Sequence, residues 1–244
     1  MTAYGRSDTG MLRHENQDAY GECRLKNGAH LALVCDGMGG ESGGKEAAEI
    51  CVSAFLHDFS DGDVPSQDAL IETLVKVNAD IVERAAACGY ARMGTTVVLA
   101  LALSDTVTLL WVGDSRAYLY HGGTLTRLTR DHSYVQELVD RGTITEREAR
   151  THHHRHLITR AVGTDDAFAP DVCRVPWCEG DRLLLCSDGL FGMVEEKEIK
   201  EILAEDHPLA RTAHELICAA NSHGGEDNIT VLLLENTKES LPDA

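Results

Sequence analysis

The sequence lacks any long apolar run, and this absence excludes a membrane-spanning helix. Its longest candidates, such as residues 97–102, have only the length of a strand. The first ten residues also lack the apolar core of a secretory signal peptide. We therefore expect a cytoplasmic protein that does not insert into a membrane.

Cysteine pairs of the C-x-x-C type are absent as well, although the chain contains eight cysteines. A structural zinc site is therefore not expected. Without a secretory signal, a framework of disulfides is not expected either. Cys35 and Cys186 lie inside apolar runs, which predicts that both are small residues of the core.

Basic residues are scarce: 22 lysines and arginines face 40 aspartates and glutamates, so the net charge is −18. Such a surface repels nucleic acid and anionic membranes, and neither is expected as a partner. It also repels phosphorylated substrates, unless metal ions or arginines reverse the sign of the charge locally. Internal repeats, low-complexity tracts and linkers are absent too, and we expect one domain over residues 1–244.

Short apolar runs rich in Val, Leu and Thr predict a series of strands. These runs cover residues 19–25, 31–35, 96–103, 107–112, 117–121, 182–187 and 228–234. Turn residues at 104–105, 113–115 and 122–123 join neighbouring runs, which predicts antiparallel hairpins.

Helical spacing of apolar residues predicts three helices among these strands. The first covers residues 45–59, and the third covers 209–220. The second begins after Ser66, a good N-cap residue, and its apolar positions are Leu70, Leu74, Val77 and Ile81. Strands, then two helices, then more strands and a late helix predict an α+β domain.

The polar stretch from about residue 131 to 160 has a different character. Residues 145–148 have a capping-box pattern, and four histidines follow at His152, His153, His154 and His156. We interpret the stretch as a flap over the surface, with histidines that titrate in solvent.

Aspartates border several of the predicted strands. Asp36 and Asp188 end two of them, Asp18 and Asp227 precede two others, and Asp114 lies in a predicted hairpin turn. In an antiparallel sheet the exit of one strand lies beside the entry of its neighbour, so these carboxylates can converge. Clustered carboxylates need cations, and oxygen ligands suit Mg²⁺ or Mn²⁺. The plainer alternative is that each Asp-Gly pair is only a turn signal.

A nucleotide-binding loop is a second possibility at the same place. Residues 39–45 fit the first seven positions of a P-loop between a strand and a helix. The next position requires Ser or Thr, but here it is Glu46, whose carboxylate would repel nucleotide phosphates. A P-loop nucleotide hydrolase is therefore the weaker hypothesis.

Six ordered blocks resemble the metal-dependent protein phosphatase family, also called type 2C, in its bacterial single-domain form. The blocks are RHENQD (13–18), DGMGG (36–40), MGTT (93–96), VGDSR (112–116), SDGL (187–190) and EDNIT (226–230). Together they span about the whole chain. The resemblance implies a four-layer α-β-β-α sandwich, in which two antiparallel sheets are flanked by helices and two Mn²⁺ or Mg²⁺ ions bind at one end.

The resemblance also implies a role for particular residues. Asp36 would bridge both ions, and the carbonyl of Gly37 would bind one of them. Asp188 and Asp227 would hold the other ion, while Asp18 would act mainly through metal-bound waters. Asp114, together with Asp188, matches the position that holds a third, weaker ion in bacterial relatives. Arg13 matches the phosphate-binding arginine of the family.

The activity implied is hydrolysis of phosphoserine and phosphothreonine in proteins by a metal-activated water. The partners implied are a cognate bacterial Ser/Thr kinase and its substrates, and the chain is expected to be a monomer. A catalytically weak, phosphoprotein-binding module of the same fold is the alternative.

Two departures from the family pattern concern protons and charge. Met38 stands where some relatives have a histidine that is assigned as general acid, and Gln17 stands where relatives often have glutamate. Either a metal-bound water or a histidine from elsewhere, such as one of the flap, would then protonate the leaving oxygen. We expect Asp131 and His132 to help position the flap, without a catalytic role.

Overall fold

The computed structural model describes residues 1–39, 43–60, 62–90, 92–164 and 169–237. Within them the strands are β1 (Thr2–Asp8), β2 (Asp18–Arg24), β3 (His30–Met38), β4 (Gly94–Thr95), β5 (Val97–Ala102), β6 (Thr106–Val112), β7 (Arg116–His121), β8 (Thr124–Arg127), β9 (Asp171–Pro176), β10 (Arg182–Cys186) and β11 (Ile229–Glu235). The helices are α1 (Gly43–Phe59), α2 (Gln67–Cys88), α3 (Tyr134–Asp140), α4 (Glu146–Thr151), α5 (Asp188–Phe191), α6 (Glu196–Ala204) and α7 (Leu209–Ser222).

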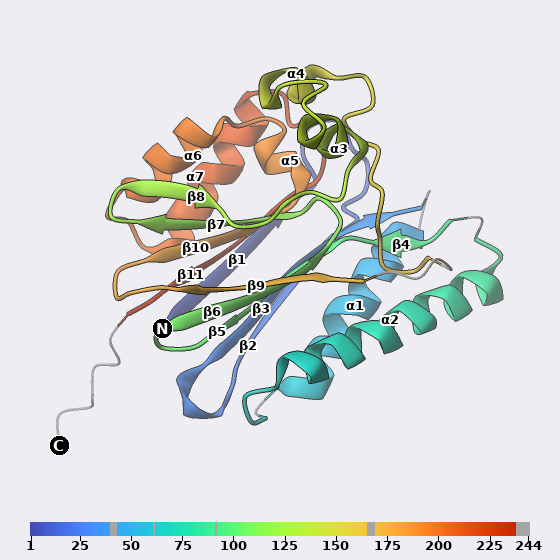
Figure 1. The fold of residues 1–244 in the computed structure, drawn as a ribbon, viewed down its shortest axis with the longest axis horizontal. Coiled ribbons are helices and arrows are strands. Elements are labelled where there is room, and N and C mark those ends of the chain that lie inside the picture. The colour runs from blue at the N-terminus through green and yellow to red at the C-terminus, as the bar shows by residue number, and fades with distance from the viewer. Residues whose placement is uncertain (40–42, 61, 91, 165–168, 238–244) are drawn as a thin grey trace.

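The strands form two antiparallel sheets that pack face to face (Figure 1). The first sheet has the order β1-β11-β10-β7-β8, and the second has the order β2-β3-β5-β6-β9, with β4 paired to the end of β3. Helices α1 and α2 cover the outer side of the second sheet, whereas α6 and α7 cover the outer side of the first (Figure 1). The expected α+β sandwich with four layers is confirmed.

Three apolar layers hold this sandwich together. One lies between the sheets and includes Val34, Val98 and Leu232, and the other two lie between each sheet and its helices. Cys35 and Cys186 are fully buried, as predicted. Strand β5 is buried along its whole length because it is covered on both faces, which explains its continuous apolar sequence.

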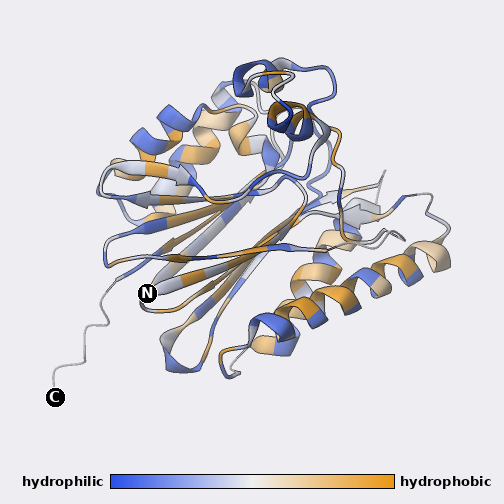
Figure 2. Cartoon of the chain, viewed as in Figure 1, coloured by the Kyte–Doolittle hydropathy of each residue, from blue (hydrophilic) through white to orange (hydrophobic). Residues whose placement is uncertain are grey.

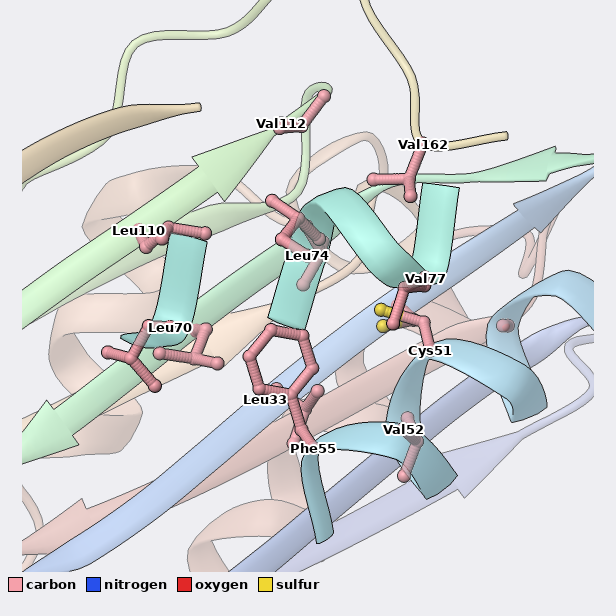
Figure 3. Close-up of a cluster of buried hydrophobic side chains, with 14 of the residues drawn as sticks. Leu33, Cys51, Val52, Phe55, Leu70, Leu74, Val77, Leu110, Val112 and Val162 are labelled. Atoms are coloured by element: carbon pink, nitrogen blue, oxygen red, sulfur yellow. The ribbon is translucent and has the colours of Figure 1, made fainter. Parts of the chain in front are cut away.

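Helix α2 shows how the sequence positions an outer layer. The Ser66 side chain accepts a hydrogen bond from the Ala69 backbone at 3.1 Å, so the helix begins where its N-cap residue predicts. The four predicted apolar positions are all fully buried: Leu70, Leu74, Val77 and Ile81. Figure 3 shows the first three of them packed with Phe55 and Cys51 of α1. Hydrophobic and hydrophilic residues accordingly alternate along α2 (Figure 2).

The turn at residues 113–115 was wrongly predicted to be a hairpin. It joins β6 of the second sheet to β7 of the first, so it crosses between the sheets. Strand β6 pairs with β5 and β9, and β7 pairs with β10 and β8. Gly113 has a φ of 105°, and a Cβ there would come within 2.6 Å of Thr96. Glycine therefore allows this close crossing. The predicted hairpins at 104–105 and 122–123 do occur.

No helix in the described ranges is long and apolar enough to span a bilayer.

Candidate metal centre

Two of the five predicted aspartates are direct neighbours in the second sheet. Asp18 begins β2 and Asp36 lies near the end of β3, and the strand register makes them Cα partners. The Asp36 backbone is fixed on its other side, because its carbonyl accepts a hydrogen bond from the Thr96 N–H at 2.8 Å. Two carboxylates are thus presented side by side at one end of the sheet.

The other three aspartates come from the first sheet and from the crossing between the sheets. Asp188 follows β10 as the first residue of α5, and Asp227 lies just before β11, the strand next to β10. Asp114 lies in the turn between β6 and β7 and is buried. Neighbouring strand ends therefore bring carboxylates of both sheets to the same end of the sandwich.

A cavity of about 670 Å³ opens at this end. Four of the predicted carboxylates line it, and Asp18 adjoins it through its pairing with Asp36. The other predicted residues that line it are Arg13 and Gly37. All of the predicted site residues thus come together, although they are up to 214 positions apart in the chain.

The carboxylates of this cluster act on one another electrostatically. Burial raises the pKa of Asp18 to about 7, and the charges of Asp188 and Asp227 act in the same direction. Burial, followed by the charges of Asp18, Asp188, Asp114 and Asp227, raises the pKa of Asp36 well above its ordinary value. Anions this close cannot all stay ionised near neutral pH unless a cation offsets their charge.

The pKa values of the outer carboxyl groups are raised for the same reasons. Burial and then the charge of Asp188 raise the pKa of Asp114 well above its usual range. Burial and Asp188 also raise the pKa of Asp227, whereas Arg13 lowers it. The charge of Asp188 therefore acts on both Asp114 and Asp227.

The donor set fits hard divalent cations. One carboxylate oxygen each of Asp18 and Asp188 is buried and has no hydrogen-bond partner in the part of the chain that is described. Leaving such oxygens without a partner is costly, and a cation would satisfy them. Among the described residues, no three acidic, imidazole or thiol side chains approach closely enough to enclose an ion alone. An ion here would need water or a backbone carbonyl among its ligands, as Mg²⁺ commonly does.

Gly37 provides a place for such a carbonyl. Its N–H donates to the Gln17 carbonyl at 3.2 Å, and a Cβ on it would come within 2.1 Å of the Gly44 oxygen. Only glycine fits where the end of β3, the loop before β2 and the start of α1 meet.

Hydroxyl groups link the carboxylates of the two sheets. The Ser187 side chain donates to Asp18 at 2.7 Å, and it accepts from the Thr230 N–H at 2.9 Å. The Thr230 hydroxyl lies 2.7 Å from the Ser7 hydroxyl. These contacts fix Asp18 of the second sheet against β10, β11 and β1 of the first.

The loop that carries Arg13 is held by Asn228, which had no role in the sequence-based prediction. The Asn228 amide donates to the carbonyls of Thr9 and Glu15 at 2.9 and 3.0 Å, and its oxygen accepts from the Gln17 N–H at 2.8 Å. Arg13 itself contacts Asp227 at 2.7 Å and is half-exposed. Its place in the block EDNIT and a polar amide just before a buried strand are the signals in the sequence that mark Asn228.

One flap histidine reaches this cavity. His156 lines it, and its Nδ1 is 3.9 Å from a carboxylate oxygen of Asp188. His152, His153 and His154 pack against one another instead, with ring centroids 3.8 to 5.7 Å apart. Met38 also lines the cavity and has no proton to donate.

The flap is anchored at both ends of residues 131–160. Asp131 accepts hydrogen bonds from Arg116 and Arg127 at 2.7 and 2.6 Å. His132 accepts at Nδ1 from the Gly113 N–H at 3.2 Å, and its carbonyl accepts from the Thr159 N–H at 2.7 Å. His132 therefore connects the two ends of the flap to the turn that carries Asp114.

The P-loop alternative gains no support from the structure. Lys45 lies in the first turn of α1, with its amino group 3.8 Å from Glu15. Residues 40–42 of the proposed loop lie outside the described residues.

A protein-family model described as protein phosphatase 2C matches residues 13–224. The chain is 39% identical over 241 residues to the serine/threonine phosphatase stp of Listeria welshimeri, and the match covers 96% of each chain. It is 38% identical to the serine/threonine protein phosphatase PstP of Mycobacterium tuberculosis, a match that covers 94% of this chain and 44% of PstP.

Solved structures show the same fold. The serine/threonine phosphatase of S. agalactiae superposes with a TM-score of 0.90 at 34% identity, covering 95% of this chain and 98% of that one. The catalytic domain of PstP in complex with two manganese ions superposes with a TM-score of 0.83 at 35% identity, covering 97% and 98% of the two chains.

Proposed function

The chain belongs to the protein phosphatase 2C family, so it is a serine/threonine phosphatase, and we propose that it hydrolyses phosphoserine and phosphothreonine in proteins at a centre of two divalent ions. The observation that carries this proposal is the cavity in which carboxylates of both sheets meet beside Arg13. Burial, and then the charges of the neighbouring carboxylates, raise the pKa values of Asp18 and Asp36. Mn²⁺ or Mg²⁺ would therefore bind there by displacing protons.

The resemblance to the family implies the ligand assignment, and the cavity gathers most of the residues concerned. Asp36 would contact both ions, with the Gly37 carbonyl on one of them and with Asp188 and Asp227 on the other. Asp18 would act through water, and Asp114 with Asp188 would hold a third, weaker ion. Two such ions, when bound, supply the nucleophile by lowering the pKa of a water molecule, and they offset the charge of the phosphate.

The chain's own residues bind and orient the phosphorylated substrate. Arg13 is half-exposed and its planar guanidinium has five N–H donors, so it can grip phosphate oxygens while it contacts Asp227. Asn228 fixes the loop on which Arg13 stands. The net charge of −18 makes this local arginine important, because the rest of the surface repels a phosphate.

We further propose that the chain acts in the cytoplasm as a monomer and opposes a bacterial Ser/Thr kinase. The support is the resemblance of the whole chain to stand-alone bacterial phosphatases, such as stp, of which it covers 96%.

The test is turnover of an aryl phosphate and of a phosphothreonine peptide with Mn²⁺, before and after EDTA. We expect activity that EDTA abolishes and that Asp36→Asn reduces by at least about a thousandfold, since one electrostatic contact to the transition state already contributes a hundred- to thousandfold. Asp80→Asn, on the exposed side of α2, is the matched control and should keep full activity. Full activity of Asp36→Asn would reject the site. Mn²⁺ binding without turnover in the wild type would favour the non-catalytic binding module.

A further inference from the structure

A second cavity of about 200 Å³ adjoins the metal centre beneath the flap. The two cavities share five lining residues: Arg13, Asp114, His156, Asp188 and Asp227. A side chain that enters the second cavity therefore lies next to the place where we propose that the phosphate binds. Both groups can belong to one phosphoprotein chain. In Figure 1 the flap helices α3 and α4 lie at this end of the molecule, near α5.

Apolar side chains from three elements and the segment after α5 line this cavity. Val135 belongs to α3 and Ala149 to α4, while Phe191 ends α5 and Met193 follows it. Val135 and Ala149 are buried, and Phe191 and Met193 are half-buried. The flap and α5 thus contribute an apolar wall to a compartment whose remaining lining is mostly charged, with Asp131, Glu146 and Glu226 among it.

The arginines that line only this second cavity already have partners. Arg116 pairs with Asp131 at 2.7 Å, and its guanidinium lies 3.6 Å from the centre of the Phe191 ring. Arg150 donates to the Phe191 carbonyl at 3.1 Å, and Arg155 lies 3.4 Å from Glu226. These contacts close the compartment between flap and core, and Asp131 and Glu226 offset the charges of Arg116 and Arg155.

We propose that this cavity is a specificity subsite, and that it receives an apolar side chain of the phosphoprotein close to the phosphorylated residue. This proposal rests on the proposed function, because it uses the same bound substrate. An extended chain advances about 3.5 Å per residue, so the apolar side chain belongs within about three residues of the phosphoresidue. The enzyme then selects phosphoserine and phosphothreonine sites that have a leucine-sized neighbour.

The test is a set of phosphothreonine peptides in which each nearby position carries glycine, leucine, glutamate or lysine in turn. We expect leucine at one position to raise kcat/KM about tenfold over glycine, the lower end of what an apolar pocket discriminates. Ala149→Leu fills the cavity and should abolish this preference while leaving hydrolysis of an aryl phosphate unchanged. Ala210→Leu, at an exposed position of α7, is the matched control and should keep the preference.

Met193→Ala provides an independent second variant, should Ala149→Leu fail to fold. It enlarges the cavity and should shift the preferred residue from leucine to phenylalanine. Wild-type enzyme that hydrolyses the aryl phosphate but prefers no apolar position, or prefers glutamate or lysine, would overturn the subsite alone. An unchanged leucine preference in the folded variants would do the same. Wild-type enzyme without Mn²⁺-dependent hydrolysis of either substrate would overturn the proposed function, and the subsite with it.

Discussion

At the scale of single residues, the site depends on polar side chains that each make several hydrogen bonds, such as Asn228 and Ser187. Asn228 satisfies both amide hydrogens and its oxygen with three backbone groups of the Arg13 loop. Ser187 both donates to Asp18 and accepts from Thr230. Such residues hold the loop and the carboxylate in place before any ligand arrives, so less ordering is left for the binding step.

Replacing Asn228 with Asp should lower kcat/KM for a phosphothreonine peptide by about a hundredfold, the effect of a small displacement of a catalytic group. The change removes two donors and puts a negative charge against the carbonyls of Thr9 and Glu15. Steady-state kinetics and inhibition by inorganic phosphate would measure it, and both should show weaker phosphate binding.

The control for this change is Asn236→Asp. Asn236 is equally buried and donates to the Ser104 carbonyl at 3.0 Å, but it follows the opposite end of β11. An equal loss of activity in both variants would show that Asn228 has only a structural role.

His30 is the residue for which we expect a pH-dependent stability. It is buried at the start of β3, and neither ring nitrogen has a hydrogen-bond partner among the described residues, although Glu22 lies 3.6 Å away. Burial lowers the pKa of His30 below 6.5, against the charge of Glu22. The unfolded chain therefore binds this proton more readily, and stability is full above pH 6.5 and falls as the pH drops below it.

Urea unfolding of the wild type and of His30→Leu, between about pH 5 and about pH 8, would measure this contribution. As the pH falls, the free energy of unfolding of the wild type should decrease relative to that of His30→Leu. A difference that stays constant across this range would contradict the prediction.

At the scale of elements, the sequence predicts the central strands, the edge strand β2 and the long helices. The other three edge strands, β1, β8 and β9, were missed, because they are partly exposed and have no continuous apolar run. Helix α2 was predicted to its first residue, because Ser66 and four buried positions mark it. Short helices such as α5 are fixed by tertiary contacts that no local pattern records.

Arg182 illustrates how one element is fixed by another. This buried arginine of β10 donates to the carbonyls of Leu203, Glu205 and His207 at 3.0, 2.6 and 3.2 Å, and it pairs with Glu235. It thereby binds carbonyls at and just beyond the C-terminal end of α6, where a helix leaves its last carbonyls without intrahelical partners.

Arg182→Met should therefore lower the free energy of unfolding by about 3 kcal/mol, since it leaves a carboxylate and several carbonyls without their partner. Urea denaturation would measure this loss. Arg174→Met, at an exposed position of β9, is the control and should change stability by less than about 0.5 kcal/mol. Equal stability of Arg182→Met and the wild type would refute the capping role.

At the scale of the whole molecule, the metal centre is a junction between the two sheets. Asp18 and Asp36 belong to the second sheet, whereas Asp188 and Asp227 flank strands of the first. The sequence predicted that these residues converge, because neighbouring strand ends adjoin. It did not predict that Asp114 lies on a crossing between the sheets, because a Gly-Asp-Ser turn has the same local pattern in a hairpin.

Because ions at this junction would bind the folded state alone, Mn²⁺ should stabilise the whole chain against heat. One ion at a hundred times its Kd adds about 2.7 kcal/mol, which corresponds to a rise in Tm of about 5 to 10 °C for a chain of this size. Differential scanning calorimetry would measure the rise, and EDTA should reverse it. A double variant, Asp36→Asn with Asp188→Asn, should show no rise with Mn²⁺, and an undiminished rise in that variant would place the stabilising ions elsewhere.

The most direct measurement is anomalous diffraction from crystals of the wild-type protein grown with Mn²⁺. We predict two strong peaks in the cavity that Asp36 lines, with carboxylates of both sheets directed toward them. A cavity without anomalous scattering, or manganese bound only at other surfaces, would contradict the central claim that this chain gathers its aspartates around paired divalent ions.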